Sequence, residues 1–210
     1  MEKCIIFGAA EFHRLLHPIQ PGDYIIAADG GMKHLSKCGK NPHAILGDFD
    51  SLGYVPEGGE VFPVEKDDTD VMLAIRHGLE KGFQEFYIYG GMDGQRLDHT
   101  LANYQALSFL RSHGARGYLI GKDYIATVIR DECACFPASA AGILSVFCMG
   151  ADAQGITLRG LQYNMEAGQL TADYPLGISN HFTGQPAEIS VMNGSLLLLW
   201  DFENGLPAIR

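Results

Sequence analysis

Positive charge is scarce in this sequence. Its 210 residues include 15 Lys and Arg against 25 Asp and Glu, which gives a formal net charge of −10 with His neutral. Proteins that bind nucleic acids or anionic membranes neutralise phosphates with clustered Lys and Arg. The charge therefore argues against a nucleic-acid partner and against a membrane partner. An anionic ligand would have to be held by local features, such as metal ions or backbone N–H groups.

Several familiar catalytic motifs are missing. No two glycines stand two positions apart, which excludes the dinucleotide motif G-x-G-x-x-G, and no Lys precedes Ser or Thr, which excludes a P-loop. The nucleophile elbow G-x-S-x-G and the zinc motif H-E-x-x-H do not occur either. If the chain is an enzyme that handles phosphates, it uses another device.

The five cysteines form no recognisable framework. Their number is odd and their spacing irregular, so a secreted disulfide scaffold is not supported. Cys133 and Cys135 have no nearby His or second cysteine pair that would complete four zinc ligands. The N-terminal segment MEKCIIFGAAEF turns polar too early for a secretory signal. We interpret the uncharged stretch 133–151 as a loop that enters a buried strand, and we expect a reduced, cytoplasmic protein.

Hydrophobic residues make up 47% of the chain, enough for a substantial core. Over the first 120 residues, short apolar runs alternate with amphipathic stretches, which predicts a parallel sheet covered by helices. One helix is expected after Thr69 or Asp68 as N-cap, with Gly82 beyond its end. A second helix is expected after Asp98 as N-cap, with Gly114 beyond its end.

The second part of the chain has a different pattern. After about residue 124, strand-like segments such as GILSVFCM and SLLLLWDF are separated by Gly, Asn and Pro. This pattern is typical of a small antiparallel sandwich or barrel. We therefore predict an α/β domain over residues 1–130 and an all-β domain over 131–210, with the boundary between 121 and 138.

Carboxylates are concentrated where the predicted strands end. In an open α/β sheet the carboxyl ends of parallel strands lie along one edge, where ligands bind. Four acidic clusters at that edge would repel one another unless cations were present, and Mg²⁺ prefers carboxylate and phosphate oxygens. The clusters are Asp29 in ADGG, Asp48 and Asp50 in LGDFDS, Asp67, Asp68 and Asp70 in KDDTD, and Asp93 and Asp98 in GGMDGQRLDH.

Each of these features also has a purely structural interpretation. A single Asp after a strand is a common turn or N-cap residue, and the glycine pairs Gly30-Gly31 and Gly90-Gly91 could be ordinary turn residues instead of phosphate-binding ones. Arg96 could clamp a phosphate or simply pair with Asp98. His99 could titrate in a site or lie at the surface. Trp200 could stack on a ring ligand or pack in the core.

Taken together, ADGG, GDFDS, KDDTD and GGMDGQRLDHTLAN resemble, in this order and spacing, the bacterial thiamine pyrophosphokinase family. The segments GLQYNME and PLGISNHF and the final LLLLW strand are similar to the thiamine-binding β-domain of the same family. The resemblance spans nearly the whole chain. It implies transfer of the pyrophosphoryl group of ATP to the hydroxyl of thiamine, with Mg²⁺, to give thiamine diphosphate and AMP.

The resemblance also implies roles for single residues and an assembly. The family is homodimeric, with active sites shared between the α/β domain of one chain and the β-domain of the other. Asp48, Asp50 and Asp70 would bind Mg²⁺ and organise the triphosphate, and Asp98 is a candidate base for the thiamine hydroxyl. The residues expected to line the ATP site are Asp29, Gly30, Gly31, Gly90, Gly91, Arg96 and Asn103, and those expected to face thiamine are Ser179, Asn180 and Trp200.

Two other functions stay open at this level. A diphosphokinase for another heterocyclic alcohol could use the same first domain, and the β-domain would decide between the substrates. A non-catalytic sensor of nucleotide or thiamine could bind the same ligands without turnover. The full set of acidic clusters speaks against the sensor, because a binding module needs affinity and gains nothing from a complete Mg²⁺ constellation.

Overall fold

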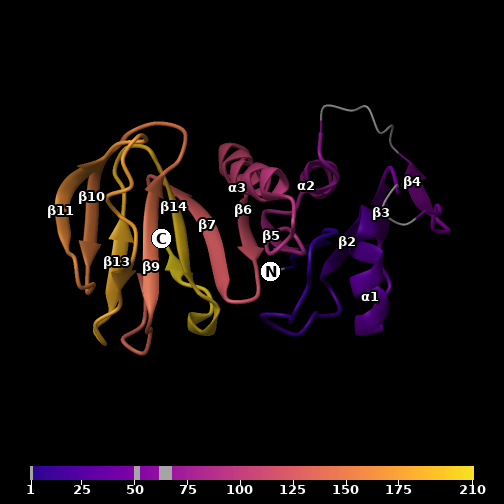
Figure 1. Cartoon of the computed structure of the whole chain (residues 1–210), viewed down its shortest axis with the longest axis horizontal. Helices are drawn as coiled ribbons and strands as arrows, with labels where there is room; N and C mark the ends of the chain where they lie inside the picture. Colours follow the sequence, from indigo (N-terminus) through magenta and orange to yellow (C-terminus); the bar gives the residue numbers. More distant parts are fainter. Residues whose placement is uncertain (1, 50–52, 62–67) are drawn as a thin grey trace. The chain divides into compact units, whose positions relative to one another are not determined.

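The computed structural model describes residues 2–49, 53–61 and 68–210 of the chain, which divides into two compact units, 1–122 and 123–210 (Figure 1). Within the described residues, no helix is both long and apolar enough to cross a membrane. The predicted fold class is confirmed, since helices and parallel strands occupy the first unit and antiparallel strands the second.

The first unit is built on a parallel sheet. Its strands lie in the order β6-β5-β1-β2-β3-β4, and each neighbouring pair is parallel. The central strands are buried almost throughout, as expected for a sheet covered on both faces. The bounds are β1 Cys4–Phe7, β2 Tyr24–Ala28, β3 Ala44–Gly47, β4 Gly59–Val61, β5 Glu85–Tyr89 and β6 Arg116–Ile120.

Three α-helices pack on this sheet among the described residues: α1 (Met32–Cys38), α2 (Asp70–Glu80) and α3 (Leu97–Ser112). Helix α1 follows the 3-10 turn η1 (Asp29–Gly31) directly. Helices α2 and α3 lie side by side in Figure 1 and contact each other as well as the sheet. Helix α2 buries the stripe Val71, Ala74, Ile75 and Gly78, which recurs every three to four residues and faces the strands.

The helix predicted after Thr69 is confirmed in both bounds and cap. Thr69 has extended backbone angles, and its Oγ1 accepts a hydrogen bond from the N–H of Met72 at 3.2 Å. The start of the second helix differs from the prediction. Arg96 occupies the N-cap position of α3 without a capping side chain, and Asp98 lies inside the first turn. The reason is that the Asp98 carboxylate pairs with Arg96 instead of capping the backbone.

The second unit consists of two antiparallel layers. One has the strand order β12-β9-β14-β7 and the other the order β11-β10-β13-β8-β15. The ring of Phe136 in β8 lies 5.5 Å from that of Trp200 in β14, so the layers pack face to face. The bounds are β7 Tyr124–Arg130, β8 Cys133–Phe136, β9 Ile143–Cys148, β10 Ala153–Arg159, β11 Met165–Leu170, β12 Asn180–His181, β13 Ala187–Ser190, β14 Ser195–Asp201 and β15 Ala208–Ile209, with the 3-10 turn η2 at Phe202–Asn204.

One feature of this region differs from the expectations. The segment 133–136, expected to be part of a loop, is strand β8, because alternate side chains face the core and both of its edges pair with other strands. The compact units divide at 122/123, which lies within the interval 121–138 given for the domain boundary and before the start of β7. Strand β7 pairs with β14 along its whole length, so it belongs with the second unit.

Candidate active site

A cavity of about 520 Å³ opens in the first unit, within the size range of small-molecule sites. Its described lining comes from the segments that follow strands β1, β2, β3 and β5 and from the starts of helices α2 and α3. The lining residues are Ala9, Ala10, Ala28, Asp29, Asp48, Asp68, Thr69, Asp70, Val71, Gly90, Gly91, Gly94, Gln95, Arg96, His99, Thr100 and Asn103.

Strand topology explains why the cavity forms there. Strand β1 has β2 on one side and β5 on the other, so the chain winds in opposite directions from this point. Ligands of open α/β sheets bind outside the carboxyl ends of the strands at such a switch point. The segments after β1 and β5 are held together, because the N–H of Gly8 donates to Tyr89 O at 2.8 Å and the N–H of Ala10 to Gly90 O at 2.9 Å.

Two helix N-termini also border the cavity. Thr69, Asp70 and Val71 belong to the start of α2, whereas Arg96, His99 and Thr100 belong to the start of α3. The first turn of a helix has N–H groups without intrahelical partners and carries the positive end of the helix dipole. Phosphate groups bind readily at such positions.

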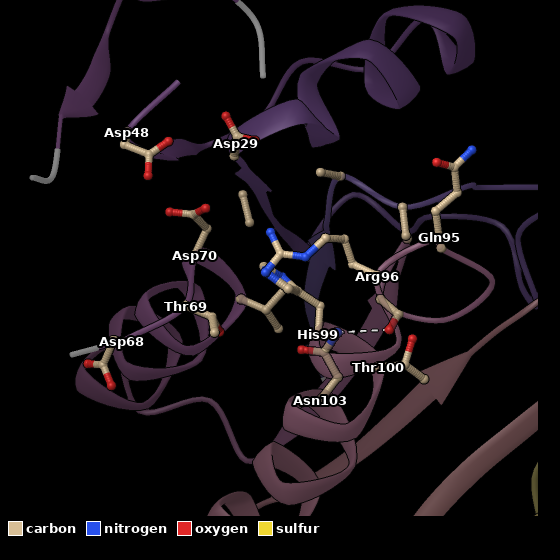
Figure 2. Close-up of a pocket in the computed structure, with 17 residues that line it drawn as sticks. Asp29, Asp48, Asp68, Thr69, Asp70, Gln95, Arg96, His99, Thr100 and Asn103 are labelled. Carbon is tan, nitrogen blue, oxygen red and sulfur yellow. Dashed lines mark hydrogen bonds between the residues drawn. The ribbon is translucent and has the colours of Figure 1, made fainter. Parts of the chain in front are cut away.

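Carboxylates nevertheless dominate the charge of the wall. The described lining has four, from Asp29, Asp48, Asp68 and Asp70, against one guanidinium, from Arg96. Figure 2 shows the carboxylates of Asp48 and Asp70 directed toward each other, with Asp29 on the same side of the cavity. Asp68 is compensated by Arg76, whose Nε donates to Asp68 Oδ2 at 2.7 Å. A wall with this excess of negative charge suits a ligand that brings cations.

The acidic side of the cavity matches the donor set of a hard divalent cation. Asp48 and Asp70 supply carboxylate oxygens, the ligands that Mg²⁺ prefers together with substrate phosphates. The described residues contain no group of three or more His, Cys, Asp or Glu side chains arranged to hold a metal. Asp50, predicted as a further ligand, lies outside the described residues. Mg²⁺ held jointly by two carboxylates and a triphosphate fits the described part of this wall.

Asp98 does not line the cavity. Its carboxylate is 64% exposed and forms two hydrogen bonds with Arg96, from Nε at 3.1 Å and from Nη2 at 2.6 Å. These bonds lower the pKa of Asp98 to about 2. A carboxylate with so low a pKa is a weak proton acceptor at neutral pH, so the geometry suits Asp98 to orient Arg96 more than to act as a base.

The predicted glycines have different surroundings. A Cβ on Gly31 would clash with the carbonyl oxygen of Phe7, so this position is glycine because η1 packs against β1. Gly30 and Gly31 are buried and do not line the cavity. Gly90 does line it and has a φ of 62°, in the region that favours glycine. Asn103, 4% exposed, donates from Nδ2 to Gly91 O at 2.8 Å and so ties α3 to the glycine-rich loop (Figure 2).

Sequence reasoning missed part of the lining. Ala9 and Ala10 follow β1, and Gln95 and Thr100 lie beside Arg96 and His99. The alanines carry no chemical signal, since only their backbone and methyl groups face the cavity edge. The two polar residues could have been found from their neighbourhood, because Gln95 stands inside the GGMDGQR loop and Thr100 is one helical turn after Arg96.

The residues expected to face thiamine belong to the second unit and have unequal exposure. Ser179 is exposed, with a φ of 56°, and its N–H donates to Ser145 Oγ at 3.0 Å. Asn180 is 3% exposed, and its amide binds the backbone of Tyr163 twice, at 2.9 and 2.7 Å. Its role here is to hold the segment around Tyr163, whose side chain is 63% exposed.

Trp200 was expected to stack on a ligand, and the structure does not offer its ring for that purpose. The side chain is fully buried between the two layers of the second unit, against Phe136. Its Nε1 donates to Gly205 O at 2.8 Å, so the indole N–H is satisfied as well. In this chain Trp200 is a core residue.

Comparison with known proteins identifies the family. Residues 16–119 match the family model described as "Thiamin pyrophosphokinase, catalytic domain", and residues 137–196 match "Thiamin pyrophosphokinase, vitamin B1 binding domain". The chain is 27% identical over 190 residues to the thiamine pyrophosphokinase of Bacillus subtilis (strain 168), covering 83% of this chain and 85% of the relative.

Solved structures have the same fold. The crystal structure of the Bacillus subtilis thiamine pyrophosphokinase superposes with a TM-score of 0.81 at 23% identity, covering 95% of this chain and 99% of that one. A thiamin pyrophosphokinase family protein from Enterococcus faecalis gives 0.78 at 25% identity, covering 96% and 99%. Each unit holds one of the two matched segments, and every described lining residue of the acidic cavity except Ala9 and Ala10 lies within residues 16–119. This chain therefore belongs to the thiamine pyrophosphokinase family and is an enzyme of that family.

Proposed function

We propose that the chain transfers the pyrophosphoryl group of ATP to the hydroxyl of thiamine, with Mg²⁺, and releases thiamine diphosphate and AMP. The observation that carries this proposal is the cavity at the β1/β5 switch point, with carboxylates on one side and Arg96 and two helix N-termini around it. That combination suits a metal-bound triphosphate better than any neutral ligand. The match to a vitamin B1 binding domain supports thiamine as the acceptor.

In this proposal Asp48 and Asp70, together with Asp50, would hold Mg²⁺. The ion would supply neutralisation of the phosphate charge and orientation of the triphosphate. Asp29, 5% exposed and directly after β2, would form the floor beside these ligands. Gly90 and Gly91 would let the glycine-rich loop approach the nucleotide closely, and Asn103 would fix that loop.

Arg96 and the backbone of two helix starts would also act on the phosphates. Arg96 presents a planar guanidinium, which can bind two phosphate oxygens at once. The first turns of α2 and α3 add N–H donors and the positive ends of two helix dipoles. Attack at the β-phosphorus needs positioning and charge stabilisation more than an activated nucleophile, so this arrangement supplies what the reaction requires.

Thiamine recognition and assembly belong to the same proposal. Ser179 would contact thiamine, Asn180 would hold the adjoining Tyr163 segment, and Trp200 would support the layer from within. A homodimer would bring the second unit of one chain to the cavity of its partner. A reduced, cytoplasmic setting agrees with five free cysteines.

The experiment that tests the proposal is to incubate the purified chain with ATP, thiamine and Mg²⁺ and to follow the products by ³¹P NMR. AMP and thiamine diphosphate should appear in equal amounts, and omission of Mg²⁺ or thiamine should prevent both. ADP with thiamine monophosphate would mean that the wrong phosphorus was assigned. Turnover of another heterocyclic alcohol in preference to thiamine would support pyrophosphoryl transfer but contradict thiamine as the acceptor.

A further inference from the structure

Two cysteines in the second unit lie within contact distance of each other. Neither is among the residues that line the cavity. The Sγ atoms of Cys133 and Cys135 are 3.5 Å apart, and neither cysteine forms a disulfide. Both belong to β8, in which Ala134 and Phe136 face the core. Because alternate side chains of a strand point to opposite faces, both thiols lie on the outer face of the layer, where each is partly exposed.

The neighbouring strands bring a charged pair to the same face. Glu188 of β13 is the register partner of Cys135. Arg210 exchanges two backbone hydrogen bonds with Cys133, at 2.8 and 3.0 Å, so its side chain emerges beside that cysteine. The Arg210 guanidinium interacts with Cys133 and lies 3.8 Å from a Glu188 oxygen. The thiols therefore have an arginine and a glutamate next to them, of which the arginine interacts with Cys133.

From this juxtaposition of two thiols on one face of β8 with the guanidinium of Arg210 beside them, we propose that Cys133 and Cys135 form a two-thiolate site for a soft monovalent metal ion of the Cu(I) class. Thiolates are the ligands that soft ions select. Two thiolates with a monovalent ion leave a net charge of −1, and the Arg210 guanidinium, which also faces Glu188, is the positive group beside them. The strand backbone fixes the spacing, so both sulfurs reach one ion with only side-chain rotation.

The same geometry argues against the two other uses of a cysteine pair. Zinc sites are four-coordinate, and among the described residues no third His, Cys, Asp or Glu joins this pair in a group that could hold a metal. A disulfide needs Cβ atoms within about 3.5–4.5 Å, whereas residues two apart in a strand are spaced by about 6.6 Å. Strand β8 is paired on both edges, so it cannot shorten without breaking its ladder.

The test is anaerobic competition between the reduced full chain and bicinchoninate, a chromogenic chelator, for Cu(I). The wild-type chain should withdraw one equivalent of Cu(I), and X-ray absorption should show two sulfur ligands. Cys133→Ser and Cys135→Ser should each bind at least about 100-fold more weakly, because the second thiolate acts at a high effective concentration. Cys148→Ser is the matched control, since Cys148 is also partly exposed and should leave the affinity unchanged.

Several results would overturn the assignment. Failure of the wild-type chain to compete, or equal affinity of wild type and Cys133→Ser, would each remove the site. Nitrogen or oxygen ligation of the bound ion would do the same. Loss of two thiols and a mass lower by two hydrogens on treatment with glutathione disulfide, with release of two glutathione thiols, would identify a disulfide-forming pair instead. None of these results depends on whether the chain transfers a pyrophosphoryl group to thiamine, so the two proposals fail separately.

Discussion

Among single residues, Asp70 matters for the proposed chemistry because it both begins a helix and lines the cavity. It is the first residue of α2, and its carboxylate lies on the acidic side of the cavity. We expect Asp70→Ala, and likewise Asp48→Ala, to lower kcat by at least about 100-fold, the scale of losing one preorganised electrostatic group. Steady-state rates of AMP formation at saturating ATP and thiamine provide the measurement. Glu80→Ala, at the exposed other end of the same helix, should retain wild-type turnover.

If Asp70→Ala or Asp48→Ala turned over at a near-normal rate, that residue would leave the catalytic set. A loss of activity in Glu80→Ala equal to that in Asp70→Ala would show that the helix, and not the carboxylate, is what the substitution damages. Comparing Asp70→Ala with Glu80→Ala therefore distinguishes loss of a catalytic carboxylate from damage to helix α2.

Arg96 and Asp98 give a second prediction at this scale, because they form one ion pair of which only Arg96 lines the cavity. Arg96→Ala should lower kcat/KM for ATP by roughly 100-fold, whereas Asp98→Asn should change it by less than about tenfold, mainly through KM. The lowered pKa of Asp98, about 2, keeps its carboxylate ionised throughout the neutral range. Titration of this pair should therefore leave no step in the pH profile between pH 5 and 9.

A kcat loss of 100-fold or more in Asp98→Asn, with KM unchanged, would restore Asp98 as the base. A step near neutral pH that disappears in Asp98→Asn would contradict the assigned pairing. Kinetics of both variants across that pH range supply the evidence for either result.

At the scale of elements, helix α2 owes its start to one side chain. Thr69 Oγ1 satisfies the N–H of Met72, one of the donors that the first turn leaves without an intrahelical partner. Thr69→Ala should lower the free energy of unfolding by about 1 kcal/mol, and Thr69→Ser should recover most of it. Urea unfolding followed by circular dichroism at 222 nm measures both. Equal midpoints for wild type and Thr69→Ala would mean that the cap contributes nothing.

The elements differ in how far the sequence predicts them, for physical reasons. Helix α2 was predictable because a capping Thr precedes Met72, Ile75 and Leu79 at helical spacing, although of these three only Ile75 is fully buried. Helix α1 was not predicted, since seven residues with only Leu35 buried give no periodic signal. Strand β8 lies in a stretch predicted to begin as a loop, because Cys-Ala-Cys-Phe lacks the polar alternation that marks a half-exposed strand. The position of the acidic cavity followed from the strand ends alone, without any of these details.

Side-chain orientation in β14 shows where such predictions stop. Leu196, Leu198 and Trp200 are buried, whereas Leu197 and Leu199 are partly exposed. All five are apolar, so the sequence does not reveal which alternate set faces the core. For this reason the sequence did not indicate that the side chain of Trp200 faces the core instead of a ligand. Asn180 is a similar case, since only the structure reveals that its amide binds Tyr163.

On the scale of the whole molecule, the two units carry separate spectroscopic signals. The α-helices of the described residues all belong to the first unit, and the single Trp of the chain is buried in the second. Circular dichroism at 222 nm therefore follows mainly the first unit, and tryptophan fluorescence follows the second. A ligand that binds one unit can then be assigned to it by its effect on two unfolding curves.

Because every described residue of the cavity wall lies in the first unit, Mg·ATP should stabilise that unit directly. At a concentration of about 100 Kd, binding adds about 2.7 kcal/mol to the free energy of unfolding. We expect the dichroism midpoint in urea to rise accordingly, with a smaller rise in the Trp200 fluorescence midpoint, and Asp70→Ala to abolish both rises. Equal rises would show that the two units unfold as one cooperative body. A rise confined to the Trp200 curve would place the nucleotide in the β-domain and contradict the proposed site, since no group of the acidic cavity could then account for its affinity.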